Sequence, residues 1–345
     1  MTTEMDDISR RNLSGHSGFV FSTRFESTGR FLYSASIEGV ICKWDVETRS
    51  LVDQFMIHEG PINDLDCTEN RLASVGYDGT VSILSLDGKI QQRRRLSSPL
   101  HAVKLLEDGL AYAGRDQTVY VETHNGQFSL NQHTDAIECL SANSQQLLSG
   151  SRDSTLCLWD LKEKRLIHIL SGHSGWVTQT AFVDTRTAIS VGEDGLVIHW
   201  DLTTGHKTWE IDTGEPIWGL TLDQAAEHAV IGKAGNPIWL DLTTKFFFEL
   251  ENTDGFACRG LSVSCKNIIA LGNDSGGIQF YSPKDLTLSE SVATSNQGIL
   301  TATSNEYGYL TGHQDGSVNL PDASNNDATS FHDSMAYAST RLSGV

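Results

Sequence analysis

Short runs of alternating apolar and polar residues recur along the whole chain and predict β-strands. Thr155–Trp159 and Leu196–Trp200 are clear examples, because they are rich in β-branched or aromatic residues and are bounded by turn-forming residues. Pairs such as Asp78-Gly79 and Asp194-Gly195 separate the runs, and their glycines supply the positive φ angles that tight hairpins require. No convincing helical period interrupts this pattern, so we expect an all-β fold.

The strand pattern repeats as a unit of about forty residues, a length that is typical of one blade of a β-propeller. The clearest copies end on Trp44-Asp45, Trp159-Asp160 and Trp200-Asp201, and they open on His16, His133 and His173. The end of the third strand of each unit can be followed to positions near 44, 84, 121, 159, 200, 240, 280 and 320. The steps leave no gap long enough for a second domain, so the sequence predicts eight units in a single domain.

On these residues the chain resembles the WD40-repeat family. The resemblance extends over roughly residues 13–320; it is strong in the first, fourth and fifth units, recognisable in the second, and degenerate in the third, sixth, seventh and eighth. It implies one propeller of four-stranded antiparallel blades around a central channel. We expect eight blades, with seven as the alternative because seven is the commoner number in the family. The predicted boundaries are a flexible N-terminus at 1–7, the propeller at 8–320, and a C-terminal tail or closing strand at 321–345.

Two segments compete for the outer strand of the last unit. Ile8–Leu13 precedes Gly15-His16 as Leu166–Leu170 precedes Gly172-His173, so it is expected to close the ring. Ala328–His332 is the alternative closing strand.

The resemblance also implies a buried hydrogen-bonded tetrad in each well-preserved unit. The matching residues are His133, Ser149, Asp153 and Trp159 in the fourth unit, and His173, Ser190, Asp194 and Trp200 in the fifth. In such a chain the indole donates, the hydroxyl both donates and accepts, neutral histidine relays, and the carboxylate accepts. A Ser/His/Asp trio also invites a catalytic interpretation, but recurrence in successive units favours a structural role.

The other units keep only parts of the tetrad. Glu38 replaces the aspartate in the first unit, and Leu84 replaces the tryptophan in the second. The third unit keeps only Asp116, and the sixth has Ala234 at the aspartate position. We therefore expect the greatest rigidity in the fourth and fifth units.

Charge and composition narrow the function. The 345 residues contain 25 Lys and Arg against 44 Asp and Glu, which gives a net charge of −19. A field of that sign repels nucleic-acid backbones and anionic membranes, so neither is an expected partner. The six cysteines have no CxxC spacing, and we find no apolar leader, long apolar run, P-loop or HExxH motif. We therefore expect no metal and no cofactor, and a cytoplasmic protein with the nucleus as the alternative.

Partner binding is expected on the top face, which in the family is lined by the bulge of each first strand and by the residue before each turn aspartate. The selected positions are Tyr77, Arg115, Arg152, Trp176, Glu193, Trp218, Lys233 and Arg259. Tyrosine, tryptophan and arginine dominate binding hot spots. The four basic residues would form a local basic ring that suits an acidic or phosphorylated peptide. The alternative is that they are isolated surface residues.

Two further runs fall on predicted outer strands. Among Phe246, Phe247 and Phe248, alternation buries one or two rings and leaves at least one exposed, which would suit a side-on partner or self-association. Arg93-Arg94-Arg95 is either an interaction or import patch or a solvated strand edge.

Together these features predict a non-catalytic interaction scaffold within a multiprotein complex. One alternative is the substrate-recognition subunit of a ubiquitin ligase, although none of the three Trp-Asp tetrapeptides ends in the arginine that such receptors often carry. The other is an enzyme with a site in the central channel, for which the sequence shows no cluster of carboxylates or metal ligands.

Overall fold

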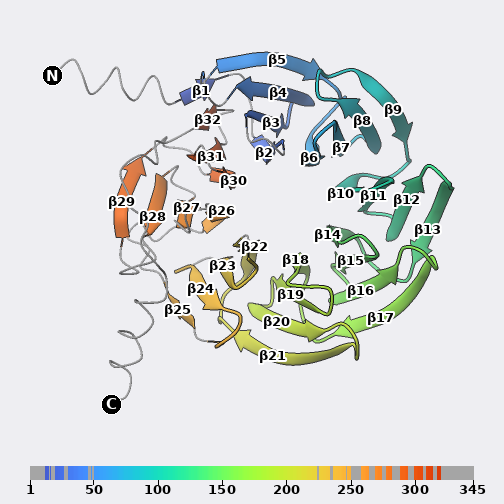
Figure 1. Ribbon diagram of the computed structural model, residues 1–345, viewed down its shortest axis with the longest axis vertical. Helices are drawn as coiled ribbons and strands as arrows, with labels where there is room; N and C mark the ends of the chain where they lie inside the picture. The colour runs from blue at the N-terminus through green and yellow to red at the C-terminus, as the bar shows by residue number, and fades with distance from the viewer. Residues whose placement is uncertain are drawn as a thin grey trace.

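Strands of the chain follow one another around a ring in the computed structural model (Figure 1). The structure describes residues 12–14, 16, 20–26, 30–45, 48, 50–223, 225–233, 236–245, 247–249, 258–263, 269–273, 277–281, 288–293, 299–305, 308–313 and 317–319. For β1 and for the strands from β26 onward we describe the backbone. Within these residues the regular secondary structure consists of β-strands, which confirms the all-β prediction.

The described strands form eight four-stranded antiparallel sheets, which we number in the order of their first inner strand. Sheets one and two contain β2 (Val20–Phe25), β3 (Phe31–Ser36), β4 (Val40–Asp45), β5 (Ser50–Met56), and β6 (Ile62–Cys67), β7 (Arg71–Gly76), β8 (Thr80–Ser85), β9 (Ile90–Arg95). Sheets three and four contain β10 (Leu100–Leu106), β11 (Gly109–Gly114), β12 (Thr118–Thr123), β13 (Gly126–Asn131), and β14 (Ile137–Ala142), β15 (Gln146–Ser151), β16 (Thr155–Asp160), β17 (Arg165–Ser171). Sheets five and six contain β18 (Val177–Phe182), β19 (Thr187–Gly192), β20 (Leu196–Asp201), β21 (His206–Asp212), and β22 (Ile217–Leu222), β23 (His228–Lys233), β24 (Ile238–Asp241), β25 (Phe247–Glu249). Sheets seven and eight contain β26 (Cys258–Val263), β27 (Ile269–Asn273), β28 (Gly277–Tyr281), β29 (Leu288–Ala293), and β30 (Ile299–Asn305), β31 (Gly308–His313), β32 (Ser317–Asn319), β1 (Asn12–Ser14).

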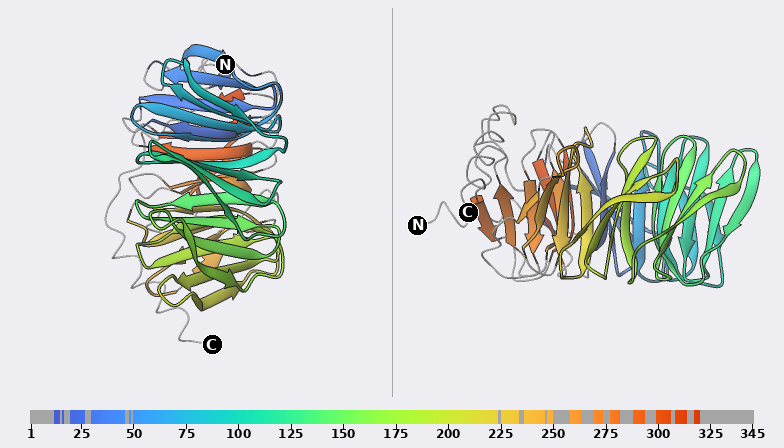
Figure 2. Two further views of the ribbon diagram at one scale, coloured as in Figure 1. Left: turned by 90° about the vertical axis from the view of Figure 1, so that its right-hand side faces the viewer. Right: turned by 90° about the horizontal axis from the view of Figure 1, so that it is seen from below.

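The first strand of each of the first seven sheets, and β30 in the eighth, lies nearest the centre of the ring, as Figure 1 shows. Viewed from the side, the ring is flattened and its strands run between the two faces (Figure 2). We call the face that carries the turns of Asp78, Asp116, Asp153 and Asp194 the top face.

Sheet eight combines the two ends of the chain. β1 pairs antiparallel with β32, with Asn12 opposite Asn319 and Ser14 opposite Ser317. β1 is therefore the outer strand of a sheet whose other three strands come from the C-terminal part. Residues 8–11, the segments 1–7 and 321–345, and the alternative strand Ala328–His332 lie outside the described residues.

Each inner strand carries a β-bulge near its start. The register of β6 with β7 shifts between Ile62 and Asp64, and that of β14 with β15 shifts between Ile137 and Cys139. The same shift occurs in β10, β18 and β22. A bulge inserts one unpaired residue and re-aims its side chain. The inserted residues in these strands are Asn63, His101, Glu138, Thr178 and Trp218.

Apolar cores form where neighbouring sheets face each other. Ile189 and Val197 of sheet five pack in one cluster with Ile231 and Leu240 of sheet six, and all four are fully buried. Between sheets the stability therefore comes from burial of β-branched and leucine side chains. The predicted turn glycines are confirmed, since Gly79 and Gly195 have φ of 75° and 80°. In sheets three and four, non-glycine residues take this position, with φ of 67° at Gln117 and 69° at Ser154.

Candidate functional site

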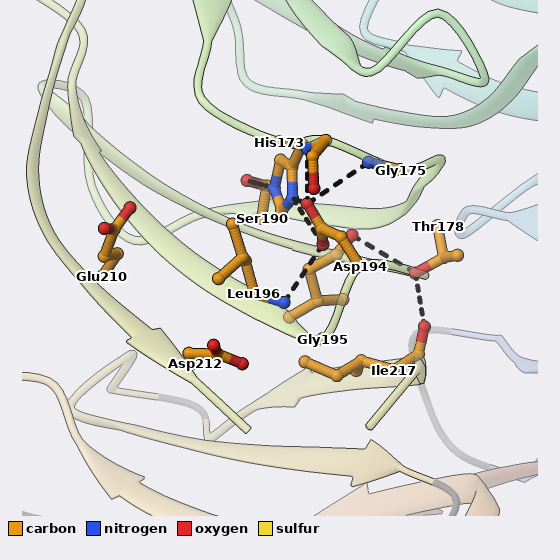
Figure 3. A network of polar contacts seen from close by, with 12 residues as sticks. His173, Gly175, Thr178, Ser190, Asp194, Gly195, Leu196, Glu210, Asp212 and Ile217 are labelled. Atoms are coloured by element: carbon orange, nitrogen blue, oxygen red, sulfur yellow. Dashed lines mark hydrogen bonds and ion pairs between the residues drawn. The ribbon is translucent and has the colours of Figure 1, made fainter. Parts of the chain in front are cut away.

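The structure brings the four predicted tetrad residues of sheet five together. Figure 3 shows three of them, His173, Ser190 and Asp194. Trp200 Nε1 lies 2.9 Å from Ser190 Oγ, and Ser190 Oγ lies 2.8 Å from His173 Nε2. His173 Nδ1 lies 3.0 Å from the nearer carboxylate oxygen of Asp194. A neutral His173 with its proton on Nδ1 satisfies every group, because indole donates to hydroxyl, hydroxyl to imidazole and imidazole to carboxylate.

The same chain forms in sheet four, and parts of it form in sheets one and two. The distances in sheet four are 2.9 Å for Trp159–Ser149, 2.8 Å for Ser149–His133 and 2.9 Å for His133–Asp153. In sheet two His58 still binds Ser74 and Asp78, at 2.8 and 3.0 Å. The hydrogen-bonded chain stops at Ser74, because Leu84 stands where the other sheets have the tryptophan. In sheet one Glu38 lies 3.9 Å from His16, which is beyond hydrogen-bond reach.

The histidines of sheets one, two and five are buried, and burial favours their neutral form. Burial lowers the pKa of His16 to about 4 and lowers the pKa of His58 and His173 as well. Burial alone would raise the pKa of Asp194, but backbone N–H groups of Ser174 and Leu196 donate to it and the net shift is downward. The tetrads therefore connect the loop before each inner strand to the turn that contains the aspartate, and their serine hydroxyls are buried.

A cavity of about 660 Å³ lies among the inner strands of sheets one to six. Three aromatic side chains line it together: Tyr77 from sheet two, Trp176 from the loop before β18, and Trp218 at the bulge of β22. Tyr77 is 56% exposed and Trp176 is 38% exposed, so two of these rings present apolar surface to solvent. Trp218 is partly buried.

Charged residues on the cavity wall are paired between neighbouring sheets. Arg24 of sheet one lies 3.2 Å from Asp64 of sheet two, and Lys104 of sheet three lies 3.1 Å from Asp66 of sheet two. Asp66 also accepts the N–H of Leu105 at 2.8 Å. The pairs neutralise the wall and connect adjacent sheets.

A second network crosses from sheet three to the loop before sheet five. Glu138 accepts from His101 Nδ1 at 3.1 Å and from Arg152 Nε at 2.6 Å. The Arg152 guanidinium lies 4.0 Å from the centre of the Trp176 ring, a cation–π contact. Burial alone would raise the pKa of Glu138, but His101 and Arg152 outweigh that effect and the pKa is lowered. Arg152 is therefore a neutralised support for Trp176 rather than a free cation.

Four of the eight predicted top-face residues line the cavity together: Tyr77, Arg152, Trp176 and Trp218. Arg115 and Glu193 lie outside the lining, in the turns of sheets three and five, where Arg115 is exposed and Glu193 is partly exposed. The side chain of Arg259 lies outside the described residues.

The prediction that Lys233 is an exposed top-face cation is wrong. Its side chain is 5% exposed and lies 2.7 Å from Glu249 and 3.4 Å from Glu215. The register explains the error. Lys233 pairs with Ile217, as Gly192 pairs with Val177, so it stands one residue before the turn position assumed from the sequence and points into the sheet.

The outer rim is apolar at two places. Phe247 on β25 is 45% exposed, whereas the side chains of Phe246 and Phe248 lie outside the described residues. β5 is also apolar on its surface, since Val52 is 50% and Met56 is 73% exposed, and the sequence interpretation missed it. The side-on contact at the phenylalanines stays a prediction.

The sequence interpretation also missed the charges Arg24, Asp64, Asp66 and Lys104. Their signal is one or two charged side chains on each of the inner strands β2, β6 and β10, at positions where alternation points them toward the ring centre. In the described part of the chain no group of three or more His, Cys, Asp or Glu side chains is arranged to hold a metal ion. The same residues contain no helix with the length and apolarity to cross a membrane.

Known proteins resemble this geometry and sequence. The family model for the WD domain, G-beta repeat, matches residues 8–45, 125–160 and 164–201. A guanine nucleotide-binding protein subunit beta from Oryza sativa subsp. japonica is 27% identical over 229 residues, 59% of this chain and 60% of that protein. Cell division control protein 4 from Saccharomyces cerevisiae is 24% identical over 201 residues, 57% of this chain and 25% of that protein. The chain thus spans less than two thirds of either relative.

Among solved structures, the computationally designed Ika8 protein superposes with a TM-score of 0.79 at 21% identity. The match covers 90% of this chain and 98% of the designed one. At that identity the likeness concerns the fold.

Proposed function

The chain belongs to the WD40-repeat family, and we propose that it is a non-catalytic scaffold that binds peptide segments of partner proteins on its top face. The eight sheets found among the described residues support counting eight blades rather than seven. The family relationship supports protein interaction as the general role, since the family model and the relatives are those of WD-repeat proteins.

One observation supports the top face as the binding surface. Tyr77, Trp176 and Trp218 come from three different sheets, yet they line one cavity. Exposed aromatic rings that converge on a rigid wall are typical binding hot spots. Because the Arg152 and Trp176 pair is held by Glu138, the surface is already ordered before a partner arrives, and binding then costs little conformational entropy.

An acidic or phosphorylated peptide remains our candidate ligand. The structure offers fewer free cations for such a ligand than the basic ring expected from the sequence, because Arg152 is paired with Glu138 and Lys233 is buried. Arg115 is the exposed cation among the described members of that set. The aromatic rings would then supply most of the affinity, and Arg115 would supply the preference for acidic sequence.

Affinity capture from the native cell tests this function. We expect defined partners with the wild-type protein and their loss with Trp176→Ala combined with Arg152→Glu, while the urea midpoint stays close to wild type. Phe247→Ala is the matched control, because it removes an exposed aromatic residue from the rim instead. Partners that survive the double substitution but vanish with Phe247→Ala would place the contact on the rim.

The captured proteins also discriminate the alternatives. Ubiquitin-ligase subunits among them would favour the substrate-receptor function. We further propose a cytoplasmic location, with the nucleus as the alternative, and no direct binding to nucleic acid or membrane. Cell fractionation and a binding assay with nucleic acid and anionic vesicles test these points.

A further inference from the structure

The loop between β9 and β10 presents an exposed serine on the top face of sheet three (Figure 1 shows the two strands). The sequence there is Arg94-Arg95-Leu96-Ser97, and Ser97 is exposed. Leu96 packs against the core cluster shared by sheets two and three. It stands four residues before Leu100, as His173 stands four residues before Val177, so it occupies the place of the tetrad histidine.

Ser97 is held less tightly than its counterparts in other sheets. The residues after the histidine in sheets two, four and five donate their N–H to the turn aspartate, at 3.0 Å for Glu59, 2.8 Å for Thr134 and 2.7 Å for Ser174. In sheet three Asp116 instead accepts the hydroxyl of Tyr120 at 2.8 Å. Within the described residues the Ser97 hydroxyl has no hydrogen-bond partner.

Backbone bonds on either side nevertheless fix the loop. Leu96 donates its N–H to Gly79 O at 2.8 Å, and Pro99 O accepts from the N–H of Arg115 at 3.0 Å. Ser97 is therefore exposed between two anchored residues, which is a suitable presentation for an enzyme that must reach a hydroxyl.

The two arginines before Ser97 retain donors for an acidic partner. Arg95 is 61% exposed and is paired at 3.0 Å with Glu59, which is itself 76% exposed, so this surface pair can exchange readily. Arg94 is 39% exposed and binds Glu122 and Gln127 through Nη1. A guanidinium has five N–H donors, and these two contacts of Arg94 use Nη1 alone.

We propose that Ser97 is a phosphorylation site for a serine/threonine protein kinase that selects basic residues before its target. Kinases select substrates by charge pattern, and arginines two and three residues before the serine would pair with carboxylates of such an enzyme. The γ-phosphoryl group of ATP moves to Ser97 Oγ, a P–O bond forms, the bond to the β-phosphate breaks, and the hydroxyl proton passes to the kinase base. The products are phosphoserine and ADP.

The phosphate would lie beside Arg115. The N–H of Arg115 donates to Pro99 O, and the Cα atom of Ser97 lies within roughly 7 Å of the Cα atom of Pro99. A phosphoserine carries up to about two negative charges and three acceptor oxygens. The phosphate would pair with Arg115, the exposed cation that we propose gives the preference for an acidic partner. This regulatory consequence depends on the proposed function, whereas the modification itself does not.

Incubation of the full chain with ATP, Mg²⁺ and a purified basic-selective serine/threonine kinase tests the site. We expect one added phosphate by intact mass, mapped to Ser97 by fragmentation and lost in Ser97→Ala. Ser98→Ala is the matched control and should leave incorporation unchanged. Arg95→Ala should lower the initial rate about tenfold. No incorporation, incorporation that persists in Ser97→Ala, or a rate unaffected by Arg95→Ala would each overturn the proposal.

A second measurement isolates the contact with Arg115. A ³¹P titration should give a lower second pKa for the Ser97 phosphate in the otherwise unaltered chain than in Arg115→Ala, since a nearby guanidinium favours the dianion. Equal values would overturn the contact. Capture of partners that is abolished by Trp176→Ala but insensitive to phosphorylation would keep the proposed function and refute the regulatory consequence.

Discussion

Sheets five and three solve the same problem with different residues. Sheet five runs its buried polar chain through Ser190, His173 and Asp194. In sheet three Tyr112 stands in the register position of Ser190, because each is the fourth residue of a six-residue second strand. Glu122 stands at the position of Trp200, the fifth residue of the third strand.

The sheet-three residues form a hydrogen-bonded chain of their own. The Tyr112 hydroxyl lies 2.6 Å from Glu122, and Glu122 lies 2.9 Å from Arg94 of the neighbouring sheet. Tyr112 also stacks on Tyr120, with ring centres 5.3 Å apart. Sheet three, which looks degenerate by sequence, therefore has a different set of hydrogen bonds in place of the tetrad. These hydrogen bonds extend to sheet two through Arg94.

The comparison teaches that satisfaction of buried polar groups is what the fold requires, rather than one set of residue types. Sheet five satisfies its groups internally, so each loss leaves orphans in a dry interior. In sheet three the charged partner, Arg94, comes from sheet two, and Glu122 is 12% exposed. Loss of one hydrogen bond there leaves Glu122 with Arg94 and solvent as partners.

The largest effect should come from Ser190→Ala. It leaves the Trp200 indole N–H and the His173 Nε2 without partners while both side chains are buried, which should cost about 2–4 kcal/mol of unfolding free energy. Urea denaturation followed by tryptophan fluorescence measures it. Ser129→Ala on the exposed face of β13 is the control and should stay within about 0.5 kcal/mol of wild type.

Acid should weaken sheet one through its buried histidine, His16. Burial lowers the pKa of His16 to about 4, whereas unfolded histidine titrates near 6.5. Between those values the unfolded state binds more protons, so the contribution of His16 is full above pH 6.5 and falls as the pH drops toward about 4, by up to about 3 kcal/mol.

Urea midpoints from pH 7.5 to 4.5 test this, with His16→Gln as the variant that cannot titrate. The slope with pH should be shallower in His16→Gln. Equal slopes in the two proteins would mean that His16 is charged in the folded state.

Tyr112→Phe should cost less than Ser190→Ala, about 1–2 kcal/mol. The ring and its stack on Tyr120 remain, and Glu122 keeps Arg94 as a charged donor. A cost equal to or above that of Ser190→Ala, in the same urea assay, would contradict the idea that sheet three shares its network with a neighbour.

The smallest expected effect is a gain from Gln117→Gly in the turn of sheet three. Gln117 has φ of 67°, a left-handed conformation that disfavours residues with a Cβ, whereas sheet five has Gly195 there. We expect stabilisation by about 0.5–1 kcal/mol, measured as a higher urea midpoint. The reverse change, Gly195→Gln, should lower the midpoint by more than Gln117→Gly raises it, because a Cβ at Gly195 would also lie only 2.9 Å from the backbone oxygen of Glu215.

The sequence by itself determined the features that depend on short-range order. Alternation and the Trp-Asp period located the strands, and the glycine pairs located turns with positive φ. The resemblance to WD40 repeats implied the hydrogen bonds among His173, Ser190 and Trp200. Each of these lies within one repeat, where the distance along the chain fixes the distance in space.

Only the tertiary structure decided which charges are free. Lys233 is buried because the register of β23 sets it one residue away from the assumed turn position, and Arg94 and Arg152 find carboxylates on Glu122 and Glu138. A strand register that slips by one residue turns a side chain to the opposite face. Arg94 and Glu122 lie on different sheets, so their pairing depends on how neighbouring sheets are set against each other, and no local pattern of residues records that.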